Sequence, residues 1–154
     1  GYDVFASSIK KVLNQNPNWK AKIIGDEKRE KIALNHNRAH ILGFKKHDEV
    51  LSIFKKTSIA VACSRWEEPF GRTSLEASAN GCAVIITNKG GLPETVTDAK
   101  ILKSLSVKEL TKTINFLMPT LFFLIILLCI YSSFTGDFLR AFNFLLSLDL
   151  VLAT

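Results

Sequence analysis

The sequence has 154 residues, 47% of them hydrophobic, and is long enough for one domain with a real core. Its net charge of +6 comes from lysines and arginines spread along the chain without interleaved aromatic residues, so we expect no nucleic-acid partner. The three cysteines, Cys63, Cys82 and Cys129, form no CxxC pair, which argues against a zinc site or a disulfide framework.

Helix-like and strand-like segments alternate through the first hundred residues. The expected elements are an amphipathic helix (4–14), a short strand (21–24), a charged helix (28–37), a brief strand (41–42), a helix capped by Asp48 (48–55) and an apolar strand (58–62). Short loops between such elements predict an α/β fold, a Rossmann-like parallel sheet with helices on both faces. Ligands of these sheets bind beyond the carboxyl ends of the strands, here at Gly25, Gly43, Ser64 and Thr87.

The stretch from Glu68 to Glu76 carries two carboxylates separated by seven residues. Pro69 has no backbone N–H to donate and Gly71 permits left-handed geometry, so Glu68 is expected on a loop. A helix-compatible run over residues 73–80 places Glu76 in its first turns. Free N–H groups at a helix start suit a phosphate, and the flanking carboxylates accept hydrogen bonds from hydroxyl groups.

Glu76 also has a purely structural interpretation. Residues 73–76 fit a capping box, in which the glutamate only bonds back to the helix start. The residues that follow favour a binding site: a small-residue helix stops at Gly81, a buried strand follows over 83–87, and a second glycine loop spans 90–94.

This combined stretch, from Ser64 to Val96, resembles the donor-binding half of GT-B glycosyltransferases, specifically the retaining group 1 (family 4) enzymes. Their signature is a Glu-x7-Glu motif, E-(P/G)-F-G-x-x-x-x-E-A-x-A-x-G, followed by a hydrophobic strand and a G-G-x-P-E loop, and nearly every position matches. The likeness extends more weakly to Tyr2 and fades after about residue 113. It implies a nucleotide-sugar-binding Rossmann-like domain over 1–113, incomplete at its N-terminus. The composition of the remaining residues predicts an apolar helical tail over 114–154.

The resemblance implies roles for the matching residues. Glu76 corresponds to the carboxylate that accepts hydrogen bonds from the ribose of the nucleotide, and Glu68 to the catalytic-site carboxylate near the donor sugar. The other implied donor-binding residues are Phe70, Gly71, Arg72 and Thr73 through their backbone amides, Gly43, Phe44 and Lys45 beside the base, and Gly90 and Gly91, which close the pocket. A plain strand end at 43–45 and an ordinary turn at 90–91 are the alternatives.

Two parts of such an enzyme do not match anything in this sequence. The family's Arg and Lys pair, which neutralises the leaving diphosphate, falls just ahead of Gly1, and the acceptor domain has no counterpart. We therefore expect a fragment that is inactive alone. The resemblance implies a nucleotide diphosphate sugar as donor substrate and no metal or other cofactor. His36 and His40, four residues apart, lack a third ligand and do not change that expectation.

Composition changes abruptly after Thr113. No charged residue occurs over 114–136, and residues 116–131 are nearly all apolar. About twenty apolar residues span a bilayer as a helix, and the lysines just before this run predict a globular part on the cytoplasmic side. Two alternatives stay open. Because AT-rich coding DNA read in a shifted frame yields mostly Phe, Leu and Ile, the tail can be a frameshifted continuation, or it can be a buried core helix.

The sequence thus favours the donor-binding domain of a glycosyltransferase. The resemblance implies that the full-length enzyme transfers a sugar with retention from a nucleotide diphosphate sugar to a glycan or glycolipid acceptor, which a separate N-terminal domain binds. The rivals are a non-catalytic Rossmann-like binding module with a membrane tail and a GT-B-shaped sugar epimerase. Since no secretory signal opens at Gly1, we expect a cytoplasmic protein, with membrane contact at the cytoplasmic face of the inner membrane.

Overall fold

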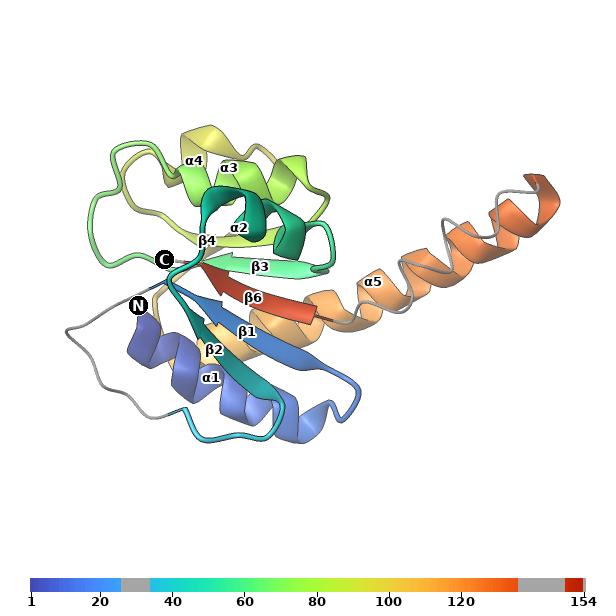
Figure 1. Ribbon diagram of the computed structural model, residues 1–154, viewed down its shortest axis with the longest axis horizontal. Coiled ribbons are helices and arrows are strands. Elements are labelled where there is room, and N and C mark those ends of the chain that lie inside the picture. Colours follow the sequence, from blue (N-terminus) through green and yellow to red (C-terminus); the bar gives the residue numbers. More distant parts are fainter. Residues whose placement is uncertain (26–33, 136–148, 154) are drawn as a thin grey trace.

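The computed structural model describes residues 1–25, 34–135 and 149–153. Within these ranges a six-stranded parallel sheet has the order β2-β1-β6-β3-β4-β5, with helices on both faces (Figure 1). The strands are β1 (Lys20–Ile24), β2 (Ala39–Gly43), β3 (Ile59–Ala62), β4 (Ala83–Thr87), β5 (Lys100–Leu102) and β6 (Asp149–Ala153). The helices are α1 (Tyr2–Gln15), α2 (His47–Phe54), α3 (Arg72–Ala79), α4 (Leu92–Thr95) and α5 (Val107–Thr135). The predicted Rossmann-like α/β fold is confirmed.

Two apolar cores lie on opposite faces of the sheet. Helices α1 and α5 cover one face, and α2, α3 and α4 cover the other (Figure 1). Successive strand side chains point to opposite faces, so Ile59 and Val61 of β3 enter the core under α1 and α5, whereas Ala60 enters the other. This arrangement places the starts of α1 and α3 at the carboxyl edge of the strands, where the site is found.

Most expected elements are present, with two corrections. Helix α2 begins at His47, and the backbone N–H of Lys46 at its cap position donates to Glu49 at 3.0 Å, so the prediction of Asp48 as the cap was wrong. The expected helix over 28–37 lies largely outside the described residues, and its described end is irregular. His36 lies in that irregular segment and His40 in β2, so the two do not share a helix face.

The last strand of the chain lies in the middle of the sheet. Leu152 of β6 pairs with Ile23 of β1 on one side and with Val61 of β3 on the other. In the usual doubly wound order, 3-2-1-4-5-6, this central place belongs to the strand that leads into the first helix. The end of β6 and the start of α1 lie at the same edge of the sheet (Figure 1). At this edge the thiol of Cys63, which follows the neighbouring strand β3, lies 3.5 Å from the carbonyl oxygen of Gly1.

Helix α5 runs without a break across the composition change after Thr113. Leu110, Ile114 and Met118 are buried in the core beneath α1. Farther along, α5 extends beyond the sheet (Figure 1). No helix in the described part of the chain combines the length and the apolarity that a membrane span requires. The predicted domain boundary after residue 113 and the frameshift hypothesis stay predictions.

Candidate functional site

A cavity of about 350 Å³ opens at the carboxyl end of β3, between the starts of α1 and α3. Its wall is formed by Gly1, Tyr2, Ala62, Cys63, Ser64, Arg65, Trp66, Glu68, Gly71, Arg72, Thr73 and Leu92. Four of the predicted site residues, Glu68, Gly71, Arg72 and Thr73, therefore meet in one hollow. This is the edge of the sheet at which the alternation of strands and helices predicted a ligand.

Gly71 sets the start of α3. It occupies the cap position with φ 76° and ψ 42°, a left-handed conformation that side chains disfavour. A Cβ atom there would also lie 2.7 Å from Cδ2 of Leu92. Because the helix begins at the next residue, the backbone N–H groups of Arg72 and Thr73 belong to its first turn, where helices lack internal acceptors. Both residues line the cavity.

The glycine loop after β4 holds the loop that carries Glu68. The N–H of Gly91 donates to the carbonyl oxygen of Glu68 at 2.7 Å, and the N–H of Gly90 donates to Oε2 of Glu67 at 2.6 Å. The ammonium of Lys89 adds an ion pair to Oε1 of Glu67 at 2.7 Å. Gly90 and Gly91 thus lie behind Glu68, outside the cavity wall formed by the described residues.

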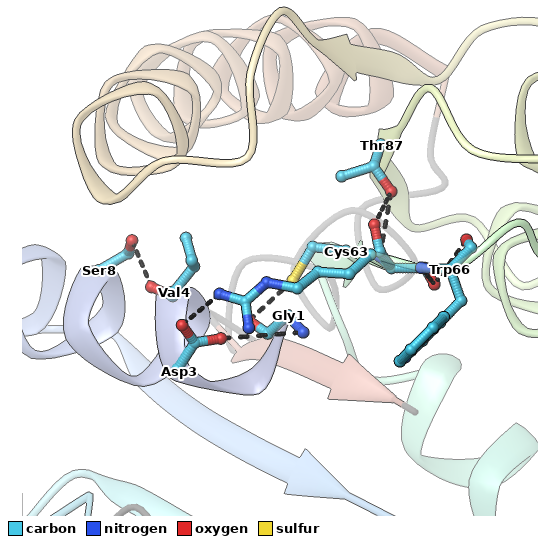
Figure 2. Close-up of polar contacts among 9 residues, drawn as sticks. Gly1, Asp3, Val4, Ser8, Cys63, Trp66 and Thr87 are labelled. Carbon is cyan, nitrogen blue, oxygen red and sulfur yellow. Dashed lines mark hydrogen bonds and ion pairs between the residues drawn. The ribbon is translucent and has the colours of Figure 1, made fainter.

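The loop after β3 is anchored on two further sides, as Figure 2 shows. The hydroxyl of Thr87 accepts from the N–H of Ser64 at 3.0 Å and donates to its carbonyl oxygen at 2.9 Å. Arg65 forms an ion pair with Asp3 at the start of α1. Burial opposes ionisation of Asp3, but this ion pair and a backbone hydrogen bond outweigh it and lower the pKa of the carboxyl. The rim of the cavity is therefore tied to both β4 and α1.

Glu76 lies one helical turn beyond Arg72. Its Oε1 atom accepts from Nε of Arg72 at 2.6 Å and lies 2.9 Å from Nε2 of His47, the first residue of α2. Partial burial opposes ionisation of Glu76, yet these two hydrogen bonds outweigh it, and the pKa of the carboxyl lies below its ordinary value of 4.5. Since Gly71 takes the cap position and no side chain caps α3, the capping-box interpretation was wrong.

The segment that follows β2 lies on the same side of the sheet. Gly43 ends β2 with φ 64°, Phe44 is exposed, and Lys45 forms an ion pair with Glu49 at 3.5 Å. A few residues later His47 contacts Glu76, so this connection runs beside α3. Phe70 is also exposed. The predicted contacts of 43–45 with a base, and of Phe70 with the donor, stay predictions.

The sequence that forms this cavity matches a known protein family. Residues 1–119 match the family model described as glycosyl transferases group 1, and the match includes the cavity wall and both motif glutamates.

The chain belongs to the group 1 glycosyltransferases.

Several curated glycosyltransferases are similar in sequence. A glycosyltransferase named MJ1178 from Methanocaldococcus jannaschii is 34% identical over 137 residues, covering 75% of this chain and 37% of that protein. The lipopolysaccharide core biosynthesis mannosyltransferase LpsB of Rhizobium meliloti is 32% identical over 107 residues, covering 63% and 30%. The phosphatidylinositol N-acetylglucosaminyltransferase gpi3 subunit of Schizosaccharomyces pombe is 32% identical over 102 residues, covering 61% and 22%. The chain therefore spans less than two fifths of the length of these relatives.

The thiols of Cys63 and Cys82 are buried. Burial raises the pKa of Cys63 to about 11 and that of Cys82 to about 12, so both behave as small core residues. Among the described residues, no three His, Cys, Asp or Glu side chains gather as metal ligands. Metal independence stays a prediction.

Sequence reasoning missed three residues that shape the candidate site: His47, Arg65 and Glu67. Glu67 directly precedes the motif glutamate, and an acidic pair before Pro69 was a usable signal. His47 is 29 residues from Glu76 and Arg65 is 62 residues from Asp3, so no local pattern in the sequence connects either pair.

Proposed function

We propose that this chain is the donor-binding domain of a retaining, metal-independent glycosyltransferase, which moves a sugar from a nucleotide diphosphate sugar to a glycan or lipid acceptor. One observation carries the proposal: Glu68 and the first two residues of α3, Arg72 and Thr73, line a single cavity, and Glu76 lies one turn away. Membership of a glycosyltransferase family supports it and disfavours both the epimerase and the non-catalytic binding module.

Three parts of the donor, the diphosphate, the sugar and the ribose, have matching groups in this site. The N–H groups of Arg72 and Thr73, at the positive end of the α3 dipole, suit the diphosphate. The absence of a side chain at Gly71 lets the phosphates approach the backbone closely. Glu68 accepts from the hydroxyls of the donor sugar, and Glu76 accepts from the ribose. The anchored carboxylate of Glu76 and the fixed helix start are in place before the ligand arrives, which lowers the ordering cost of binding.

Transfer needs more than donor binding. The leaving diphosphate requires positive charge, and in the described cavity wall the two arginines, Arg65 and Arg72, are each paired with a carboxylate. We place the acceptor site in another part of the full-length enzyme. Two relatives are named for lipopolysaccharide core biosynthesis and for phosphatidylinositol N-acetylglucosaminyl transfer, which favours a lipid-linked acceptor at the cytoplasmic face of a membrane. The isolated chain should bind a donor without transferring its sugar.

The experiment is a titration of the chain, by calorimetry, with UDP-glucose, UDP-N-acetylglucosamine and GDP-mannose. We expect saturable binding of at least one of these nucleotide sugars without added metal. Glu76→Gln should weaken it by roughly 10-fold or more, because a hydrogen bond to a charged acceptor contributes about 1.5–3 kcal/mol. Asp98→Asn makes the same chemical change at an exposed turn and should leave affinity unchanged. Absence of binding to all three nucleotide sugars would overturn the proposal.

A further inference from the structure

Helices α2 and α3 meet through a cluster of three charged or titratable side chains beside the cavity. His47 opens α2, and Arg72 and Glu76 lie one turn apart on α3. Nε2 of His47 and Nε of Arg72 both contact Oε1 of Glu76, at 2.9 Å and 2.6 Å. The side chain of Glu76 is only 20% exposed, against 49% for His47 and 71% for Arg72, so the carboxylate lies beneath the two donors.

The donor and acceptor roles in this cluster follow from its chemistry. A guanidinium only donates hydrogen bonds, and an ionised carboxylate only accepts them. His47 can therefore bond to Glu76 only if its Nε2 carries the proton. That nitrogen then cannot also accept from Nη2 of Arg72, which lies 3.3 Å away. Both of these bonds fall on Oε1 of Glu76, and neither uses its other oxygen, Oε2.

We propose that His47 is a positioning residue for donor binding. Together with Arg72 it anchors Oε1 of Glu76, so that Oε2 is held in place to accept from a ribose hydroxyl. This inference rests on the proposed role of Glu76 as the ribose acceptor. An unanchored glutamate loses side-chain freedom when it binds a ligand, whereas an anchored one has lost most of it already. His47 comes from the segment after β2, outside the Glu-x7-Glu motif and its helix, whereas Arg72 lies within both.

A structural role for His47 makes a different prediction. If the histidine only joins α2 to α3, its removal should weaken every nucleotide equally, whether or not a ribose hydroxyl is present. If it positions Glu76, the loss should be confined to ligands that carry the hydroxyls. Nucleotides with and without the ribose diol therefore separate the two roles within a single protein.

The test measures dissociation constants of UDP, GDP and ADP, and of their 2′,3′-dideoxy counterparts, for the wild-type chain and its variants. We expect His47→Ala to weaken the best ribonucleotide about 10-fold, a free-energy change of about 1.4 kcal/mol. The dideoxy counterpart should change less than about 2-fold. His47→Gln places an amide N–H near the position of Nε2 and should restore most of the affinity. His40→Ala removes an exposed histidine from β2 and is the matched control.

Each outcome bears on the inference. Equal weakening of the ribonucleotide and its dideoxy counterpart, or no rescue by His47→Gln, overturns the positioning role and leaves the proposed function intact. If the wild type binds none of the three nucleotides, the proposed function fails and this inference fails with it. Should His47→Ala not fold, His47→Phe keeps a planar ring without the donor and undergoes the same comparison.

Discussion

The backbone of Gly90 lies directly against the backbone of Glu68. A Cβ atom added at Gly90 would fall 2.1 Å from the carbonyl oxygen of Glu68 and 2.6 Å from its amide nitrogen, closer than any real side chain approaches. The glycine loop after β4 and the glutamate loop after β3 are thus one packed unit. The spacing between them is fixed by backbone contact, so each motif constrains the position of the other.

The first prediction follows from this contact. Gly90→Ala should lower the free energy of unfolding by roughly 1–3 kcal/mol, because the residue has φ 53° and its Cβ meets backbone atoms that cannot move aside cheaply. It should also weaken nucleotide-sugar binding by displacing Glu68. Gly81→Ala is the matched control: its φ is 86°, but its Cβ would meet nothing within 4 Å. Urea unfolding and donor titration of both variants measure the difference, and equal effects would show that the backbone contact is unimportant.

The second prediction concerns acid stability. The pKa of Glu76 lies below its ordinary value of 4.5 in the folded chain, so the unfolded chain binds its proton more readily. This contribution to stability is present above about pH 4.5 and is lost as the pH falls through the lower folded value. Glu76→Gln cannot titrate. The difference in unfolding free energy between pH 7 and pH 3 should therefore be smaller for Glu76→Gln than for the wild type.

Other carboxyls also lose their stabilising ionisation in acid, but they are the same in the wild type and in Glu76→Gln, so they do not affect the difference between the two proteins. The pKa values of Asp3, Glu49 and Glu67 are also lowered, the last mainly by its hydrogen bond with Lys89. They should cause both proteins to lose stability in acid. If the two denaturation curves shift in parallel between the two pH values, the hydrogen bonds from Arg72 and His47 do not stabilise ionised Glu76 in the folded state.

The third prediction tests the central place of β6. Val151 is fully buried between β1 and β3, so Val151→Asp puts an unpaired charge into the sheet and should unfold the chain. Ile101→Asp makes a comparable change on the edge strand β5, where the side chain is exposed, and should be tolerated. Circular dichroism and urea titration compare them. A folded and equally stable Val151→Asp variant would mean that the C-terminal segment does not belong to the sheet.

Elements whose formation depends on a short stretch of sequence were predicted from that stretch. The strands at 20–24, 59–62 and 83–87 are short apolar runs that end near Gly, Ser or Thr, and all three form. Strand β6 could not be predicted, because its apolar residues belong to the stretch 114–154, whose composition predicts an apolar helical tail. Its place between β1 and β3 depends on an opening in the sheet that only the assembled fold creates.

In the site, too, the residues that are close in sequence were predicted and the contacts between distant residues were not. Glu68, Gly71, Arg72 and Thr73 are close in sequence and meet in one cavity, as the motif predicts. The environment of Glu76 was ambiguous, because a capping box and a binding site share the same spacing. What separates them is the left-handed conformation of Gly71, which moves the helix start ahead of Thr73, and the distant contact with His47.

The last prediction uses two residues of α5 that lie two positions apart. Ile114 is fully buried beneath α1, whereas Phe116 is 62% exposed on the other side of the helix. Ile114→Ala should lower the free energy of unfolding by about 2–5 kcal/mol through lost burial and the cavity left behind. Phe116→Ala removes a larger side chain but little buried area. It should cost less than about 1 kcal/mol, the most expected from the ring's contact with Lys100, whose ammonium lies 5.9 Å from the ring centre.

A chain ending at residue 113 loses Ile114, Met118 and β6 together and should fail to fold. A soluble, cooperatively unfolding 1–113 chain, with Ile114→Ala no worse than Phe116→Ala, would instead place the domain boundary where the composition changes.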